Sequence, residues 1–320
     1  MSTPLISLKK KFSIFLAKNK NKKFVICPHS KADIDAISSA YGIASVFKNS
    51  VLALPDELNE SAKTLVRYLG IRYELLSDLD KSKFDGMIVA DTSAYTLIKP
   101  AKDWNVICII DHHKANGRDM SAPTEIFDEL SPSCAEIVAN IIPKVKDEKI
   151  AFALACGIVA DTARFKNGRE KTFETLAQLI KTSKSTYLEI LDYSEPELSL
   201  DAKVAVMRAL KRMTYTVVAN YVIATSETGS NESDTAAHLS NIVDVAFVAS
   251  YKEMEGECRM SARGRKTISV PLNEVCKAVA VSLGGNGGGH AKAAGLSIPK
   301  GDPGIVLKRC VEEFIGRIKP

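Results

Sequence analysis

Short apolar runs alternate with helical stretches in the first half of the chain, from Phe24 to about Phe165. This alternation is typical of a parallel β-sheet covered by helices. Polar residues follow each apolar run before the next helical stretch begins. Because ligands of open α/β sheets bind outside the carboxyl ends of the strands, these polar residues are candidates for chemistry. The four predicted strands are Phe24 to Pro28, Val51 to Leu54, Gly86 to Ala90 and Val106 to Ile110.

The pattern changes in the second half of the chain. Helical segments continue from Lys171 to about Leu210, and strand-like runs follow at Tyr215 to Ser226, Val243 to Tyr251 and Glu257 to Arg263. We therefore expect an α/β protein with an N-terminal doubly wound parallel sheet and a smaller C-terminal mixed-sheet α/β domain, with an active-site cleft between them. The predicted domains are residues 1–184 and 213–320. Residues 185–212 have helix formers and a single proline, which predicts a rigid helical connector.

Composition and charge narrow the class of protein. The chain has 320 residues, of which 46% are hydrophobic and 25% charged, as in folded soluble proteins. Eight lysines precede Asp33, the first acidic residue; without them the 43 basic residues fall to 35, against 38 acidic ones. The formal charge of +5 therefore assigns no nucleic-acid partner to the folded body. We expect these lysines on an amphipathic helix with Leu5, Leu8, Phe12 and Phe15 on its inner face.

The sequence lacks the signals of a membrane protein. Its apolar runs do not approach the ~18 residues that a membrane-spanning helix needs, and the longest candidate is interrupted by Gly157. The basic N-terminal segment has too short an apolar core for a signal peptide. We therefore expect a cytoplasmic protein with no membrane partner.

Acidic and histidine residues gather at the ends of four apolar runs. An isolated aspartate at position 33 would more simply cap the following helix. Burying several carboxylates together without cations, however, is strongly unfavourable because of desolvation and mutual repulsion. Oxygen and imidazole ligands suit manganese or magnesium better than a structural zinc ion. The candidate ligands, enough for two metals with Asp91 as the natural bridge, are His29, Asp33, Asp35, Asp91, His112 and Asp161.

These motifs resemble, in order and approximate spacing, the four motifs of the DHH phosphoesterase superfamily, with Asp111-His112-His113 as its signature. The run from Gly287 to Gly295 is similar to the signature of the C-terminal domain found in the branch of RecJ-type exonucleases, NrnA-like nanoRNases and adenosine bisphosphate phosphatases. Family members commonly carry Asn-Pro-Asp-Gly-Asp where this chain has Lys31 to Asp35. RecJ nucleases carry further domains, so the short chain favours NrnA-like work on small substrates. Family II pyrophosphatases have a different C-terminal domain.

The glycine-rich run has its own physical interpretation. Gly284 to Gly289, interrupted only by Asn286, lets backbone N–H groups approach an anion, and a tight turn between helix and strand is the competing interpretation. Seven basic and two acidic residues lie between Gly256 and Lys300. Arg263, at the end of a predicted strand, is equally compatible with a phosphate contact and with a solvated charge.

The resemblance implies a set of roles. One divalent cation would take His29, Asp33 and Asp91, and the other Asp35, Asp91, His112 and Asp161, with manganese favoured and magnesium compatible. Asp111 would orient a ligating histidine, and His113 would donate a hydrogen bond to the scissile phosphate. Substrate contacts would come from Arg263, Gly288, Gly289 and His290.

The implied function is hydrolysis of short single-stranded oligonucleotides to mononucleotides. Dephosphorylation of adenosine 3′,5′-bisphosphate is also consistent with the resemblance, as is a homodimer. Two alternatives stay open: a RecJ-like exonuclease acting on longer DNA or RNA, and a non-catalytic nucleotide-binding module.

Overall fold

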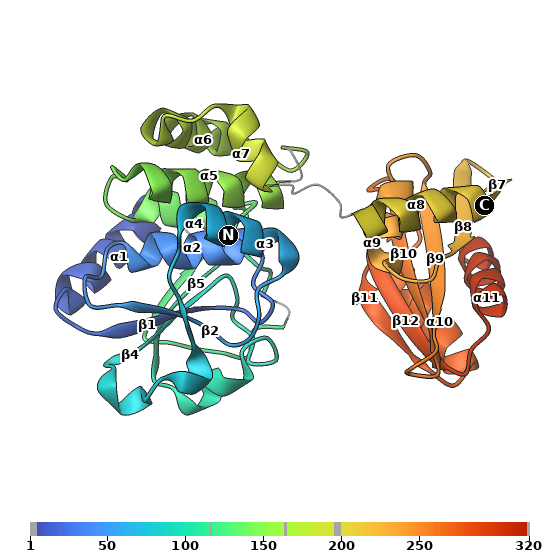
Figure 1. The fold of residues 1–320 in the computed structure, drawn as a ribbon, viewed down its shortest axis with the longest axis horizontal. Coiled ribbons are helices and arrows are strands. Elements are labelled where there is room, and N and C mark those ends of the chain that lie inside the picture. Colours follow the sequence, from blue (N-terminus) through green and yellow to red (C-terminus); the bar gives the residue numbers. More distant parts are fainter. Residues whose placement is uncertain (1–4, 116, 163–164, 195–199, 319–320) are drawn as a thin grey trace. The chain divides into compact units, whose positions relative to one another are not determined.

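The computed structural model describes residues 5–115, 117–162, 165–194 and 200–318, and it divides into two compact units (Figure 1). The first unit spans Met1–Glu197 and the second Leu198–Pro320. The predicted connector at 185–212 is divided between them. Helix α7 (Tyr187–Ser194) packs against α5 and α3 of the first unit, whereas α8 (Leu200–Arg212) packs against α9 and β8 of the second.

The first unit is built on a six-stranded sheet of order β3-β2-β1-β4-β5-β6, in which all neighbouring pairs are parallel. The chain passes from β1 to β2 and β3 on one side and then crosses to β4, β5 and β6 on the other. The strand order therefore reverses between β1 and β4, the place where such sheets bind ligands. The strands are β1 (Phe24–Pro28), β2 (Val51–Leu54), β3 (Glu74–Leu75), β4 (Gly86–Ala90), β5 (Val106–Asp111) and β6 (Thr124–Phe127).

The two faces of this sheet are covered differently. One face carries the main core, formed with α1 (Leu5–Asn19), α2 (Ile34–Ala44), α3 (Glu60–Leu69), α4 (Cys134–Ile141), α5 (Glu148–Asp161), α6 (Glu170–Ser183) and α7. The other face is covered by a smaller core to which the short 3₁₀ helices η1 (Leu76–Asp78) and η3 (Lys99–Asp103) contribute. The predicted inner residues Leu8, Phe12 and Phe15 of α1 are buried, and the side chain of Leu5 lies outside the described residues.

Helix α5 is buried almost all around because α2, α4, α6 and α7 surround it. Its apolar sequence is therefore that of a central core helix. Gly157 allows this close packing, since a Cβ there would lie 2.8 Å from the Cβ of Ala135 and 3.1 Å from Oδ1 of Asp35. No helix among the described residues is long and apolar enough to cross a membrane.

The second unit has a mixed six-stranded sheet of order β11-β12-β10-β9-β8-β7. Only β8 and β9 are parallel. Helices α10 (Leu272–Ser282) and α11 (Pro303–Gly316) cover one face, and α8 and α9 (Glu232–Leu239) lie over part of the other. The strands are β7 (Thr214–Val218), β8 (Tyr221–Glu227), β9 (Val245–Lys252), β10 (Glu257–Gly264), β11 (Asn286–His290) and β12 (Ala293–Pro299).

Two predictions for this unit differ from the structure. The run from Tyr215 to Ser226 is a hairpin rather than one strand, because the chain reverses at Ala219, whose φ is 51°. The glycine-rich run matches the predicted turn only in part: Gly284, with φ 73°, and Gly285 form the turn after α10, whereas Asn286–His290 form strand β11 at the edge of the sheet.

Candidate metal centre

The carboxyl ends of β1, β4 and β5 bring histidines and aspartates to one place. His29 directly follows β1, Asp91 follows β4, and Asp111 ends β5 immediately before His112 and His113. The backbone of Asp91 is left-handed, with φ 63°, a conformation that few residues other than glycine adopt. This strained turn is typical of residues held in place at a functional site.

Two helices complete the group. Asp33 and Asp35 lie at the start of α2, and Asp161 is the last residue of α5. Asp33 caps α2 by accepting a hydrogen bond from the backbone N–H of Ala36 (3.0 Å), and its Oδ1 also lies 4.0 Å from Nε2 of His29. The capping interpretation and the metal-ligand interpretation of Asp33 are therefore compatible.

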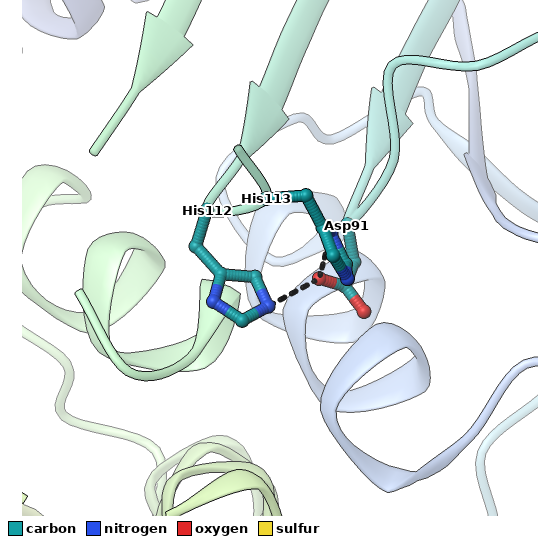
Figure 2. A group of neighbouring side chains, drawn as sticks. All are labelled: Asp91, His112 and His113. Carbon is teal, nitrogen blue, oxygen red and sulfur yellow. Dashed lines mark ion pairs between the residues drawn. The ribbon is translucent and has the colours of Figure 1, made fainter. Parts of the chain in front are cut away.

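Asp91 lies between two histidine rings. Its Oδ2 is 3.5 Å from Nε2 of His29, and its Oδ1 is 3.4 Å from Nε2 of His112. The same Oδ1 lies 3.8 Å from Nδ1 of His113 (Figure 2). Asp161 approaches from α5, with its Oδ2 3.4 Å from Nε2 of His112.

All six predicted metal ligands are thus close together. Ligand atoms within 4.8 Å of one another define three overlapping groups. These are His29, Asp33 and Asp91; Asp35, His112 and Asp161; and Asp91, His112 and His113.

Two candidate ligands, His29 and His112, are oriented by hydrogen bonds to backbone carbonyl groups. Nδ1 of His29 lies 2.8 Å from the carbonyl oxygen of Ser30, and Nδ1 of His112 lies 3.2 Å from that of Ser131. Since a carbonyl oxygen can only accept, the proton of each neutral ring belongs on Nδ1. Burial, with the charge of His113, lowers the pKa of His112 to about 4, so this ring is neutral at pH 7. Its unprotonated Nε2 then faces carboxyl oxygens of Asp91 and Asp161.

Burial of these carboxylates close to one another is unfavourable without a cation. Burial and repulsion from Asp91, Asp161 and Asp33 raise the pKa of Asp35 well above its ordinary value. Burial and Asp33 raise that of Asp91 likewise, and they raise the pKa of Asp161 to about 6. Within the described residues, the buried Oδ1 of Asp91 has no hydrogen-bond donor. Oxygen and imidazole donors around this orphaned atom fit divalent cations such as manganese or magnesium.

Asp35 is held by backbone groups that no sequence motif indicated. Its carboxylate accepts hydrogen bonds from the N–H groups of Cys134 (2.7 Å) and Ala135 (2.8 Å) at the amino end of α4. A helix N-terminus stabilises a negative charge in this geometry. Ser131, which orients His112, lies in the loop just before the same helix. Backbone donors and acceptors leave no signature in side-chain identity, so these contacts required the structure.

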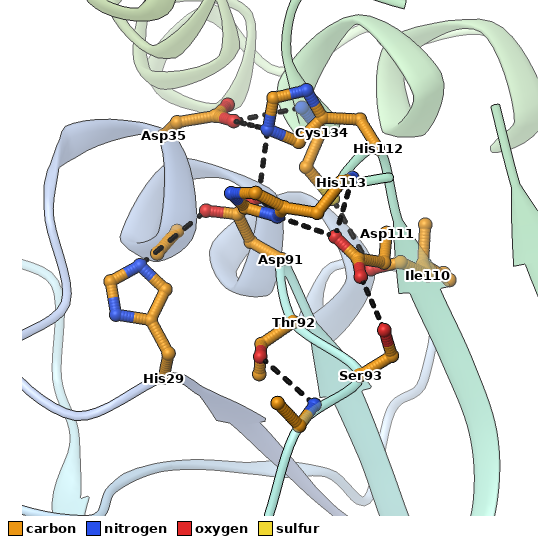
Figure 3. A network of polar contacts seen from close by, with 12 residues as sticks. His29, Asp35, Asp91, Thr92, Ser93, Ile110, Asp111, His112, His113 and Cys134 are labelled. Carbon is orange, nitrogen blue, oxygen red and sulfur yellow. Dashed lines mark hydrogen bonds and ion pairs between the residues drawn. The ribbon is translucent and has the colours of Figure 1, made fainter. Parts of the chain in front are cut away.

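Asp111 contacts a different histidine from the one predicted. Its Oδ1 accepts hydrogen bonds from the backbone N–H (3.0 Å) and from Nδ1 (2.7 Å) of His113, and its Oδ2 accepts one from Ser93 (2.7 Å) (Figure 3). Burial opposes ionisation of Asp111, but these hydrogen bonds outweigh it and lower its pKa to about 2. The prediction that Asp111 orients a ligating histidine is therefore corrected: it orients His113, while Ser131 orients His112.

The predicted substrate contacts lie in the second unit. Arg263 on β10 and His290 on β11 are both register partners of Ala293 on β12, so their side chains project from the same face of the sheet. The next residues on this face are small. We call this surface the Arg263 face; it comprises Ser261, Arg263, Gly288, His290, Ala293 and Gly295.

The glycines of β11 serve different purposes. A Cβ on Gly287 would lie 2.5 Å from the carbonyl oxygen of Cys276 in α10, and Gly289 has φ 127° and the backbone of Ala293 and Ala294 within 2.8 Å. Both are therefore required by packing. Gly288 has nothing within 4 Å of its Cβ position, so its backbone is open on the Arg263 face.

The guanidinium of Arg263 contacts only neutral oxygens, those of Ser233 (2.8 Å), Ser261 (3.2 Å) and the Ala262 carbonyl (3.1 Å). Across the described part of the chain, no carboxylate forms an ion pair with it. Asp234 lies near enough to act on Arg263 electrostatically, but a half-buried cation without a direct ion pair is suited to binding an anion.

Comparison with known proteins identifies the family. Residues 23–158 match the DHH family, N-terminal domain, and residues 214–319 match the DHHA1 domain. An uncharacterized protein of Methanocaldococcus jannaschii is 30% identical over 313 residues, which cover 91% of this chain and 94% of the archaeal one. The chain therefore belongs to the DHH family and carries a C-terminal DHHA1 domain.

Solved structures share the fold. An exopolyphosphatase-related protein from Bacteroides fragilis superposes with a TM-score of 0.75 at 18% identity, covering 97% of this chain and 96% of its own. RecJ from Thermus thermophilus, in complex with Mn²⁺, gives a TM-score of 0.54 at 13% identity and covers all of this chain but 56% of RecJ. The chain thus spans about half of RecJ. These similarities show the α/β fold with a parallel sheet in one unit and a mixed sheet in the other.

Proposed function

We propose that this protein is a metal-dependent phosphohydrolase that cleaves short single-stranded oligonucleotides to mononucleotides. The observation that carries the proposal is the position of Asp91, whose two oxygens each face the Nε2 atom of a different histidine, His29 and His112. A carboxylate in this position is suited to bridge two cations. Membership of the DHH family supports phosphoester hydrolysis as the reaction class.

We assign the candidate ligands to two cations according to which ligand atoms lie close together. His29, Asp33 and Asp91 would hold one cation, and Asp35, Asp91, His112 and Asp161 the other. When bound there, divalent cations lower the pKa of a water nucleophile and stabilise the charge that develops on the phosphoryl oxygens. Manganese suits this mixed oxygen and imidazole set, and magnesium is the alternative ion.

His113 is suited to contact the substrate. The hydrogen bond to Asp111 raises the pKa of His113, which favours the imidazolium at neutral pH. With Nδ1–H donated to Asp111, the proton on Nε2 remains available to a nonbridging phosphoryl oxygen. The side chain is 55% exposed, so a substrate can reach it.

The Arg263 face of the second unit would bind phosphates of an oligonucleotide. Arg263 supplies a cation whose hydrogen bonds within the described residues end on neutral oxygens, Gly288 an open backbone and His290 an exposed ring. Such contacts recognise the phosphate backbone rather than base identity, so binding should weaken with salt and show little sequence preference. Adenosine 3′,5′-bisphosphate also carries phosphate groups and is a second candidate substrate.

Hydrolysis of a defined panel tests the function. The full chain is incubated with manganese and with di- to pentanucleotides, a 20-nucleotide strand, adenosine 3′,5′-bisphosphate and pyrophosphate. We expect mononucleotides from the short chains, and loss of turnover in Asp91→Asn. Glu57→Gln, at a side chain that is 90% exposed, is the matched control. Faster cleavage of the 20-mer would favour a RecJ-like exonuclease, and tight binding of intact oligonucleotide would favour a non-catalytic binding module.

A further inference from the structure

A cluster of largely buried ion pairs and hydrogen bonds joins α4 to the start of α6. Glu136, in the first turn of α4, is 1% exposed, and its Oε1 accepts hydrogen bonds from Nε (3.1 Å) and Nη2 (2.8 Å) of Arg169. Its Oε2 accepts one from Thr172 (2.5 Å) in α6. Nη2 of Arg169 also donates to Asp128 (3.2 Å), another buried carboxylate. We call Arg169, Glu136, Asp128 and Thr172 the Arg169 clamp.

The segment that the clamp holds touches two of the candidate ligands. Between Asp128 and Glu136 lie Ser131, whose carbonyl oxygen orients His112, and Cys134 and Ala135, whose N–H groups hold the Asp35 carboxylate. All of these contacts use backbone atoms. The positions of both ligands therefore depend on where the clamp fixes the backbone of residues 131–135.

The ion pairs of the Arg169 clamp hold the backbone of residues 131–135 firmly in place. Glu136 is a buried carboxylate whose desolvation is offset by the Arg169 guanidinium and the Thr172 hydroxyl. Arginine spans two carboxylates because its donors form a planar fork, which a lysine ammonium cannot reproduce. The Arg169 side chain is 34% exposed, and among the described residues its guanidinium donates to the carboxylates of Glu136 and Asp128.

We propose that Arg169 is a positioning residue that sets the affinity of the cation site formed by Asp35, His112 and Asp161. The inference rests on the metal centre of the proposed function. Arg169 acts through the backbone of residues 131–135 and contacts neither cation nor substrate. Contacts behind metal ligands typically change metal affinity by about 10- to 100-fold when they are removed.

Three variants of the full chain test this role. Arg169→Met removes the clamp, and Arg169→Lys keeps the charge without the fork. Lys171→Met changes a neighbouring, partly exposed lysine that forms an ion pair with Glu174. Calorimetric titration of the metal-free proteins with manganese should show a loss of affinity of about 10- to 100-fold for Arg169→Met. Arg169→Lys should recover part of it, and Lys171→Met should match wild type.

A second measurement needs no bound metal. Amide hydrogen exchange of the metal-free protein should be faster for residues 131–136 in Arg169→Met than in Lys171→Met, with the core of α5 unchanged. If Arg169→Met does not fold, Arg169→Lys and Glu136→Gln carry the same comparison with smaller effects.

The results distinguish a failure of the positioning role from a failure of the proposed function. Unchanged manganese affinity and exchange in a folded Arg169→Met protein would overturn the positioning role, as would a raised KM at unchanged metal affinity, which would make Arg169 a substrate contact. If wild type binds manganese and Arg169→Met weakens it, but no phosphoester is cleaved, the clamp stands and the proposed function fails. A wild-type protein that binds no divalent cation would overturn both.

Discussion

The side chain of Asp33 accepts a hydrogen bond from the amino end of α2 and at the same time lies beside His29. At the scale of single residues, this dual use recurs: Asp111 ends β5 and also orients His113. The sequence alone indicated the six candidate ligands because each lies where an apolar run ends. It could not indicate Ser131, Cys134 or Ala135, because these residues act through backbone atoms. It also could not indicate which histidine Asp111 contacts, because the directions of two adjacent histidine side chains depend on the geometry of the turn after the strand.

A variant of His113 distinguishes a role in the chemical step from a role in metal binding. We expect His113→Ala to lower kcat about 100- to 1,000-fold, because a donor to the phosphoryl oxygens is lost. Manganese affinity, measured by calorimetry, should stay near the wild-type value because His29 and His112 remain. A large loss of metal affinity in this variant would instead make His113 a ligand.

Asp111 should control the alkaline limb of the pH profile. Its hydrogen bond raises the pKa of His113, so the imidazolium persists to higher pH and is lost as the pH rises through that pKa. Asp111→Asn removes the charge, lowers the pKa and should move the alkaline limb of kcat to lower pH. Ser93→Ala, which removes only the hydrogen bond to Oδ2 of Asp111, is the control with a smaller shift. Superimposable profiles for all three proteins would show that His113 does not titrate in turnover.

At the scale of elements, strands β1, β2, β4 and β5 lie where the apolar runs predicted them, because parallel strands buried on both faces consist of continuous apolar residues. Strand β11 was not predicted, because its sequence Asn-Gly-Gly-Gly-His has low strand propensity and forms by pairing with β12 at the sheet edge. Tertiary contacts, among them the approach of α10 to Gly287, override local preference there.

The glycines of β11 provide a matched pair of variants. Gly287→Ala places a Cβ against the Cys276 carbonyl and should destabilise the second unit by about 1–3 kcal/mol, as overpacking does. Gly288→Ala meets open space, so its thermal unfolding should resemble wild type while KM for a trinucleotide rises. Thermal denaturation and steady-state kinetics on both variants check this. A Gly288→Ala protein with wild-type KM would remove β11 from the substrate site.

At the scale of the whole molecule, the two units have separate cores, and the candidate metal ligands all belong to the first. The boundary between the units was expected within a helical connector, but helical sequence there gives no sign of which unit each helix packs against. Exposed and buried faces of α7 and α8 are set by partners distant in sequence. Metal binding should therefore stabilise the first unit selectively.

Stability of the metal-free protein should depend on pH through these carboxylates. Burial and repulsion raise the pKa of Asp161 to about 6 and also raise the pKa values of Asp35 and Asp91, so their protonated forms favour folding at low pH. This stabilisation is lost as the pH rises through the folded-state pKa values. The unfolding temperature of the first unit should therefore fall as the pH rises from about 4 through the pKa of Asp161, about 6. Saturating manganese should abolish the fall, and Asp161→Asn should flatten it. A metal-free protein whose stability rises across this range would contradict the assignment.

Anomalous diffraction from crystals soaked in manganese tests the central claim, a two-cation centre bridged by Asp91, most directly. A two-cation centre bridged by Asp91 should give two anomalous peaks about 3.5–4 Å apart, the spacing typical of two-metal sites. One peak should adjoin His29 and Asp33, the other His112 and Asp161, with both in contact with Asp91. A single peak that does not involve Asp91, or no peak at these residues in a protein saturated with manganese, would contradict the account.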